Sequence, residues 1–267
     1  MLSALLALPT FITLANAATT STGQVFTDLN GKIAFPEWDP FLLAGATPIG
    51  ANDFTLTYDY AFDSELIKPA PNNGLQFTLL PNPNSPKNPF GSRLSSVEKY
   101  TVGKVCFKPT LPLTTENGTI LAIYTRSFDK EPNDCFAGDR WDELDFEFLG
   151  AHPGTVWVNV FGSKFQNENG CTDQGYFLPI DIKPSYEFCM QWDARSTGTP
   201  TPNSALWFVY DEATGFYQTL RMELGRITNA MKVKMAFWGK SDLWAGDINL
   251  SGPVNAGVNS IRMWLAN

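Results

Sequence analysis

Three carboxylates occupy every second position in the stretch from residue 142 to residue 150. The stretch reads Asp-Glu-Leu-Asp-Phe-Glu-Phe-Leu-Gly, so Glu143, Asp145 and Glu147 alternate with apolar residues. On a helix this spacing would turn Asp145 roughly 200° away from the other two, whereas on a strand all three share one face. The alternation therefore predicts a strand with one acidic face and one apolar face.

Carboxylates at this spacing fit one particular chemistry. The Cα atoms of Glu143 and Glu147 would lie about 13–14 Å apart, and side chains that lean inward reach the roughly 5–5.5 Å that separates nucleophile from acid in retaining glycosidases. Because no Lys or Arg occurs from residue 141 to residue 152, the three charges would repel one another. At least one pKa should therefore rise, as a general acid needs. The alternative is a half-buried strand whose solvent face is acidic by chance.

The elements that would position this strand are further strands. Short runs rich in β-branched and aromatic residues recur at 54–60, 75–80, 120–125, 156–161, 205–210, 233–237 and 260–265. No long stretch has apolar residues at helical spacing, so few and short helices are expected. Pro- and Asn-rich segments at 68–73, 81–91 and 196–204 are predicted to be surface loops. The pattern is typical of an all-β sandwich.

Length and charge limit the kind of protein. The chain has 267 residues, 43% of them hydrophobic, which suits one sizeable core and favours a single domain over residues 18–267. Residues 1–17 are apolar and end in Ala-Asn-Ala, as a secretory signal peptide does, although an N-terminal membrane anchor is an alternative. A net charge of −8 without any Lys/Arg cluster argues against nucleic acid as a partner. A neutral polymer is a more suitable partner for this acidic chain than nucleic acid is.

Secretion changes the expected role of the cysteines. The chain contains four of them: Cys106, Cys135, Cys171 and Cys189. An even number in an oxidising compartment indicates two disulfides, for which three connectivities are possible. The pairs Cys106–Cys135 and Cys171–Cys189 close the shortest loops and are the expected ones. Asn117 and Asn249 each begin a glycosylation sequon.

Neither a cofactor nor a metal is predicted. The single histidine, His152, leaves little room for a zinc site, and a Ser-His-Asp hydrolase would depend on this one residue. Since His152 precedes Pro153 in a predicted turn, an ordinary loop position is expected for it. A structural calcium in the acid-rich segment 127–140 stays open, without assigned ligands.

The sequence around the carboxylates resembles a known family. Residues 141–150, Trp-Asp-Glu-Leu-Asp-Phe-Glu-Phe-Leu-Gly, are similar to the active-site strand of glycoside hydrolase family sixteen. Segments 100–105, 156–162, 186–193 and 235–244 resemble the neighbouring strands and the tryptophan-bearing cleft loop of that family. The resemblance covers essentially the whole mature chain.

The resemblance implies both a fold and a reaction. The fold is a concanavalin-like jelly-roll sandwich of two curved antiparallel sheets with an open cleft, in a monomer. The reaction is retaining cleavage of internal β-glucan bonds, with Glu143 as nucleophile, Asp145 as the residue that orients it and Glu147 as general acid/base. The partner would be β-glucan, outside the cell or in the cell wall, with no membrane contact after signal cleavage. A carbohydrate-binding sandwich without turnover is the alternative.

The spacing of the carboxylates also indicates a branch of the family. Laminarinases and agarases of the family tend to carry one extra residue between the aspartate and the second glutamate. This chain has none, which favours the branch of licheninases, xyloglucan endotransglucosylases and chitin–glucan transglycosylases.

The same resemblance assigns substrate-binding side chains. Cleft aromatics are expected at Trp141, Phe161, Trp192, Trp238 and Trp244, with Trp157 as a further platform. Asn159 would bond a sugar hydroxyl or Glu147, and Lys108 would replace an arginine that contacts the nucleophile. Taken singly, any of these tryptophans could pack in the core instead, as Trp207 is expected to do.

Overall fold

The protein was analysed as a computed structural model. The structure describes residues 54–57, 66–70, 74–96, 99–110, 117–127, 141–161, 175–195, 203–224 and 227–266. The expected signal peptide at 1–17, together with Cys135 and Cys171, lies outside these residues. Among the described residues, no helix has the length and apolar character that a membrane crossing requires.

The described chain consists almost entirely of strands. In chain order they are β1 (Phe54–Thr57), β2 (Ile67–Ala70), β3 (Gly74–Leu79), β4 (Ser92–Ser96), β5 (Val102–Thr110), β6 (Thr119–Arg126), β7 (Glu143–Leu149), β8 (Thr155–Phe161), β9 (Tyr176–Pro179), β10 (Tyr186–Asp193), β11 (Ser204–Asp211), β12 (Phe216–Glu223), β13 (Lys232–Gly239) and β14 (Val254–Ala266). The three carboxylates fall on β7, as the alternation predicts.

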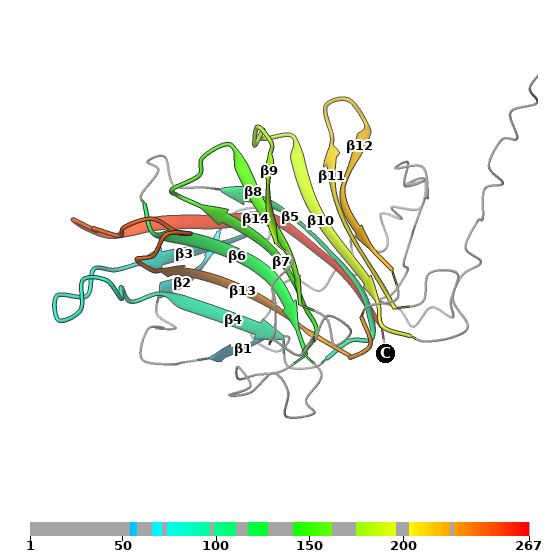
Figure 1. The fold of residues 1–267 in the computed structure, drawn as a ribbon, viewed down its shortest axis with the longest axis horizontal. Helices are drawn as coiled ribbons and strands as arrows, with labels where there is room; N and C mark the ends of the chain where they lie inside the picture. The colour runs from blue at the N-terminus through cyan, green and yellow to red at the C-terminus, as the bar shows by residue number, and fades with distance from the viewer. Residues whose placement is uncertain are drawn as a thin grey trace, which may run out of the picture.

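The strands form two antiparallel sheets of seven strands each. We call them the β7 sheet, with the order β1-β4-β13-β6-β7-β8-β9, and the β10 sheet, with the order β12-β11-β10-β5-β14-β3-β2. Figure 1 shows the two sheets stacked on one another, with long curved strands. The predicted all-β sandwich is therefore confirmed.

The core lies between the two sheets and fixes the direction of the carboxylates. Leu144, Phe146 and Phe148 of β7 belong to the main core cluster, and the rings of Phe146 and Phe148 lie 5.7 and 5.2 Å from the ring of Phe188 on β10. Because side chains alternate along a strand, Glu143, Asp145 and Glu147 must point to the opposite side of the sheet. We call that side the carboxylate face.

The structure also corrects the expected loops. Residues 68–70, expected in a loop, belong to β2, which pairs with β3 at the edge of the β10 sheet. An edge strand tolerates Pro69 because one side of it needs no ladder hydrogen bonds. The short β9 and the polar β12, both at sheet edges, were missed because neither has a buried apolar run. The loop expected at 81–91 is confirmed, and near its end Phe90 forms an isolated antiparallel bridge with Leu80.

The expected disulfide pairs are wrong. Cys106 on β5 is bonded to Cys189 on β10, so neither Cys106–Cys135 nor Cys171–Cys189 can form. The two residues are 83 positions apart, yet they face each other directly in the antiparallel register of β5 and β10. Loop length was a poor guide because strand pairing brings distant residues together.

Removal of this disulfide should lower stability. We expect Cys106→Ala/Cys189→Ala to lose about 2–5 kcal/mol of unfolding free energy, because the bond closes a long loop in the unfolded chain. Denaturant unfolding of the oxidised protein and of the double variant measures the loss. Peptide mapping without reductant checks the pairing, and a peptide that joins Cys106 to Cys135 would contradict it.

Candidate active site

The neighbouring strands place each carboxylate between two defined residues. Across β6 and β8, the register sets Glu143 between Arg126 and Phe161, Asp145 between Tyr124 and Asn159, and Glu147 between Ala122 and Trp157. No register shift interrupts this pairing on either side of β7. The expected absence of a bulge between Asp145 and Glu147 is therefore confirmed.

Asp142 anchors the start of the strand. Its side chain is fully buried, and Oδ2 accepts hydrogen bonds from the backbone N–H groups of Thr228 and Asn229 at 2.7 Å each. Its own backbone N–H donates to Ser127 Oγ at 2.9 Å. A buried carboxylate with several donors holds its position firmly. The residue before Glu143 is thus fixed from two neighbouring segments.

One oxygen of Glu143 accepts a hydrogen bond from Trp141 and forms an ion pair with Arg126. The indole Nε1 of Trp141 donates to Glu143 Oε2 at 2.5 Å, and Nε of Arg126 lies 3.1 Å from the same atom. Glu143 is only 9% exposed. Donors of this kind stabilise the ionised carboxylate and restrict its rotation. The side chain of Glu143 is therefore held in one orientation beside a positive charge.

The pKa of Asp145 is strongly raised. Burial, followed by the charges of Glu143 and Glu147, raises the pKa of Asp145 well above its usual value, and Arg126 opposes this rise. Its side-chain hydrogen bond to Glu143 raises the pKa further, as expected of a protonated Asp145 that donates to its neighbour. One raised pKa among crowded carboxylates was expected, and it falls on the middle residue of the three.

The positive charge of Arg126 should lower the pKa of Asp145. In Arg126→Met we expect the pKa of Asp145 to rise further, because the loss of a nearby positive charge disfavours the ionised carboxylate. Titration of the side-chain carboxyl carbons by ¹³C NMR measures the change. Arg126→Lys keeps the charge and should shift the pKa less. An unchanged or lower pKa in Arg126→Met would disprove this role.

Aromatic rings lie at the Glu143 end of the carboxylate face. The rings of Trp141 and Phe161 are stacked, with centroids 4.6 Å apart and an interplanar angle of 8°. The guanidinium carbon of Arg126 lies 5.1 Å from the centre of the Trp141 ring. The sequence-predicted pair Trp141 and Phe161 is thus brought together beside Glu143.

A second aromatic group lies at the Glu147 end. Trp157, opposite Glu147, contacts the rings of Phe177 and Trp244 at 4.6 and 5.9 Å, and Trp238 lies 6.5 Å from Trp244. These rings pack against the small cluster on the carboxylate side of the β7 sheet. Three predicted platform residues, Trp157, Trp238 and Trp244, are therefore gathered beside Glu147.

A tight turn carries Trp244. Asp242 Oδ1 accepts the backbone N–H groups of Trp244 and Ala245 at 3.0 and 2.7 Å, and Gly246 ends the turn with φ of 83°. That φ favours glycine, since other residues are strained there. His152, in the turn between β7 and β8 as expected, has Nε2 3.1 Å from the carbonyl oxygen of Trp244. The Trp244 backbone is therefore held by Asp242 at its N–H group and by His152 at its carbonyl oxygen.

Two predicted site residues lie elsewhere. Lys108 is on β5 in the other sheet, where Nζ pairs with Glu212 Oε2 at 2.6 Å, so it does not contact the nucleophile as expected. Trp192 on β10 is fully buried in the core, and its indole N–H donates to the carbonyl of Tyr100 at 3.1 Å. Trp207 is in the core, as expected.

Asn159 is at the centre of the carboxylate face. It lies opposite Asp145, is 3% exposed, and its Oδ1 accepts the backbone N–H of Val160 at 2.8 Å. Glu147, one of its two expected partners, is the next residue of β7 on the same face, paired with Trp157 in the register. Asn159 thus lies beside the middle carboxylate of the three.

Sequence reasoning missed Arg126, which makes the contact expected of Lys108. The signal was present in β6, where Tyr124 and Arg126 share one face of the strand. Only the pairing of β6 with β7 shows that this arginine lies opposite Glu143. Asp142 was missed for the same reason, because its donors come from residues 228 and 229.

Comparison with known proteins places the geometry in a family. The model of the glycosyl hydrolases family 16 matches residues 56–249. Xyloglucan endotransglucosylase/hydrolase protein 24 of Arabidopsis thaliana is 32% identical over 158 residues, which are 58% of this chain and 52% of that protein. The β-glucanase of Fibrobacter succinogenes is 21% identical over 67% of this chain and 48% of that protein. The chain thus spans about half the length of these relatives.

Solved structures show the same fold. A Bacillus licheniformis β-glucanase superposes with a TM-score of 0.59 at 17% identity, over 83% of this chain and 96% of its own. Crh5 transglycosylase in complex with NAG superposes with a TM-score of 0.56 at 16% identity, over 83% of each chain. The sandwich is therefore the jelly roll of these enzymes. Because the family model matches most of the chain, the protein belongs to the glycosyl hydrolases family 16.

Proposed function

We propose that the protein is a secreted, retaining endo-β-glucanase or transglycosylase that acts on cell-wall polysaccharide. The observation that carries the proposal is the oriented pair Glu143–Asp145, next to Glu147 on the same face of one strand. Family membership and the glucan- and xyloglucan-active relatives support the same conclusion. Residues 18–267 would form the catalytic domain after removal of the signal peptide.

Two displacements at one carbon describe the reaction. Glu143 attacks the anomeric carbon while the glycosidic C–O bond breaks and Glu147 gives its proton to the leaving oxygen. Glu147 then takes a proton from water or from a sugar hydroxyl, whose oxygen attacks the same carbon and releases Glu143. Two inversions retain the configuration. Water yields hydrolysis, and a sugar hydroxyl yields transglycosylation.

Asp145 supports this cycle without touching the substrate. Protonated through its raised pKa, it donates to Glu143 and holds that carboxylate in place. The half-buried Glu147 is the most exposed of the three carboxylates, as suits a group that must reach a leaving oxygen and then a water. The three roles thus follow the three environments on the strand.

The aromatic groups supply surfaces for sugar rings. The stacked pair beside Glu143 and the tryptophan group beside Glu147 would each contact the apolar face of a pyranose unit. The indole N–H of Trp244 is buried and has no hydrogen-bond partner among the described residues. A sugar hydroxyl would satisfy it. Together with the carboxylates, these residues favour a glycan chain as the ligand.

The uninterrupted pairing of β7 supports the branch of the family that lacks an extra residue between the aspartate and the second glutamate. We therefore expect activity on mixed-linkage glucan, xyloglucan or chitin oligomers in preference to laminarin. Incubation with each of these, with and without oligosaccharide acceptors, followed by mass spectrometry of the products, tests the proposal. Longer products that contain the acceptor indicate transfer, and the anomer first released, observed by NMR, tests retention. Tight glycan binding without any product would instead indicate a binding sandwich.

A further inference from the structure

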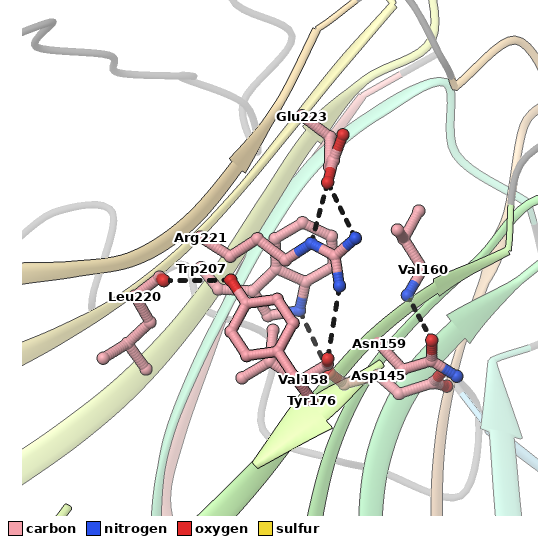
Figure 2. A network of polar contacts seen from close by, with 9 residues as sticks. All are labelled: Asp145, Val158, Asn159, Val160, Tyr176, Trp207, Leu220, Arg221 and Glu223. Carbon is pink, nitrogen blue, oxygen red and sulfur yellow. Dashed lines mark hydrogen bonds and ion pairs between the residues drawn. The ribbon is translucent and has the colours of Figure 1, made fainter. Parts of the chain in front are cut away.

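Two side chains of the β10 sheet reach across the core to the backbone of the catalytic strands. The indole Nε1 of Trp207 on β11 donates to the carbonyl oxygen of Asp145 at 3.0 Å, and Nη1 of Arg221 on β12 donates to the carbonyl of Val158 at 3.3 Å. Figure 2 shows both groups pointing at β7 and β8. The two carbonyls belong to Asp145 itself and to the residue before Asn159, which faces Asp145.

An irregularity between β11 and β12 makes this reach possible. The register shifts after Trp207, so that Trp207 faces Arg221 while Phe208 faces Thr219, and Leu220 is left as the extra residue. A bulge of this kind redirects side chains. Arg221 therefore comes to lie beside Trp207 on the core side. The carbonyl of Leu220 accepts the hydroxyl of Tyr176 on β9 at 3.4 Å.

The guanidinium of Arg221 is held on several sides. Glu223 Oε1 accepts its Nε and Nη2 at 2.9 and 2.7 Å, and its central carbon lies 5.5 Å from the Trp207 ring and 5.1 Å from the Tyr176 ring. Arg221 is 7% exposed and Trp207 is fully buried. A buried charge with fixed partners has one preferred geometry. The bonds to β7 and β8 are thus made by immobile donors.

We infer that Trp207 and Arg221 are positioning residues for the carboxylates, because they fix the peptide planes at Asp145 and Val158 from the opposite sheet. The orientation of the peptide group between Asp145 and Phe146 sets the directions in which the side chains of Asp145 and Glu147 project from the strand. The peptide group between Val158 and Asn159 likewise sets the direction of the Asn159 side chain. The inference rests on the proposed function, since it assigns these two residues to that same site.

The test removes the indole N–H group and keeps a smaller aromatic ring. In Trp207→Phe we expect kcat on the best glucan to fall about 10- to 100-fold with KM within about twofold, because small misplacement of reacting groups slows chemistry more than binding. The matched control is Trp192→Phe. Trp192 is equally buried in the same sheet and donates to the carbonyl of Tyr100, away from β7. It should lose similar thermal stability and keep kcat.

Two outcomes would overturn the inference. One is a kcat for Trp207→Phe equal to that of Trp192→Phe at comparable thermal stability. The other is an unchanged ¹³C titration curve for the Asp145 carboxyl in Trp207→Phe. If Trp207→Phe does not fold, Arg221→Lys replaces it, since it keeps the charge but loses the fork that bonds Glu223 and Val158. For that variant too, we expect a lower kcat with an unchanged KM.

The failure of the proposed function would look different. In that case the wild-type protein releases no product from any glycan, and the kinetic comparison cannot be made. The NMR titration needs no turnover, so it still decides the inference. A change in Trp207→Phe that is absent from Trp192→Phe supports the positioning role, and equal curves reject it.

Discussion

The variant Glu143→Gln is expected to lose at least about 10⁴-fold in kcat/KM on whichever glucan the wild-type protein cleaves. The amide has nearly the shape of the carboxylate, and its oxygen can still accept the N–H of Trp141. It cannot form the glycosyl ester, because an amide oxygen is a far weaker nucleophile. The loss should therefore appear in kcat with little change in Tm. Initial rates from reducing ends and thermal unfolding measure both.

A smaller side chain identifies the role of Glu143 more directly. In Glu143→Ala with sodium azide, azide should attack the anomeric carbon from the side that Glu143 occupied, while Glu147 protonates the leaving oxygen. One displacement inverts the configuration, so an α-glycosyl azide is expected from a β-glucan. NMR of the product shows the anomer. A β-azide, or activity of Glu143→Gln above about 1% of wild type, would contradict this assignment.

A matched glutamate provides the control for this variant. Glu212 lies in the turn between β11 and β12 of the other sheet, where it pairs with Lys108. Glu212→Gln makes the same chemical change as Glu143→Gln, at a surface position. It should keep full activity, since it alters no group of the carboxylate face. Equal losses in both variants would indicate a general effect on the fold.

The strand β7 with its acidic face was predictable because its information is local. A period of two over residues 143–148 fixes both the strand and its two faces, whatever else the chain does. A raised pKa was expected from local crowding of like charges, which contributes to the shift at Asp145, although burial is its largest cause. What the alternation could not assign was which carboxylate is protonated. That depends on burial and on Arg126, which comes from another strand.

The wrong assignments of Lys108 and of the disulfides depend on long-range pairing. Lys108 and Arg126 are both cationic residues near the end of a strand, and only the sheet order shows that β6, and not β5, adjoins β7. Cys106 pairs with Cys189 because β5 adjoins β10. Neither fact can be read from spacing along the chain. The position of a residue within its strand was therefore easier to predict than the sheet that holds it.

Trp192 is a different kind of error. Along β10 it alternates in phase with Phe188 and Met190, whereas Glu187 and Gln191 occupy the other face. This pattern indicates the core, and the structure agrees. The resemblance to a cleft position was given more weight than the alternation. For a buried strand, the local period was the better guide.

Replacement of Glu147 should have an effect that depends on the leaving group. In Glu147→Ala we expect kcat/KM on glucan to fall about 10³- to 10⁴-fold, because a sugar oxygen leaves poorly without a proton. A substrate of the same sugars with a dinitrophenyl leaving group needs no such proton. Its first step should therefore stay within about tenfold of wild type. Stopped-flow release of the phenolate measures that step.

The second step still needs Glu147 as a base, so the glycosyl ester on Glu143 should accumulate in this variant. Intact-mass spectrometry should show one added glycosyl unit, and a burst of phenolate should precede slow turnover. Azide should relieve the block by attacking the ester, and two inversions then give a β-glycosyl azide, the opposite anomer to that from Glu143→Ala. If Glu147→Ala slowed cleavage of the dinitrophenyl substrate as much as cleavage of glucan, Glu147 could not be the proton donor. The half-buried position of Glu147 opposite Trp157 would then need another explanation.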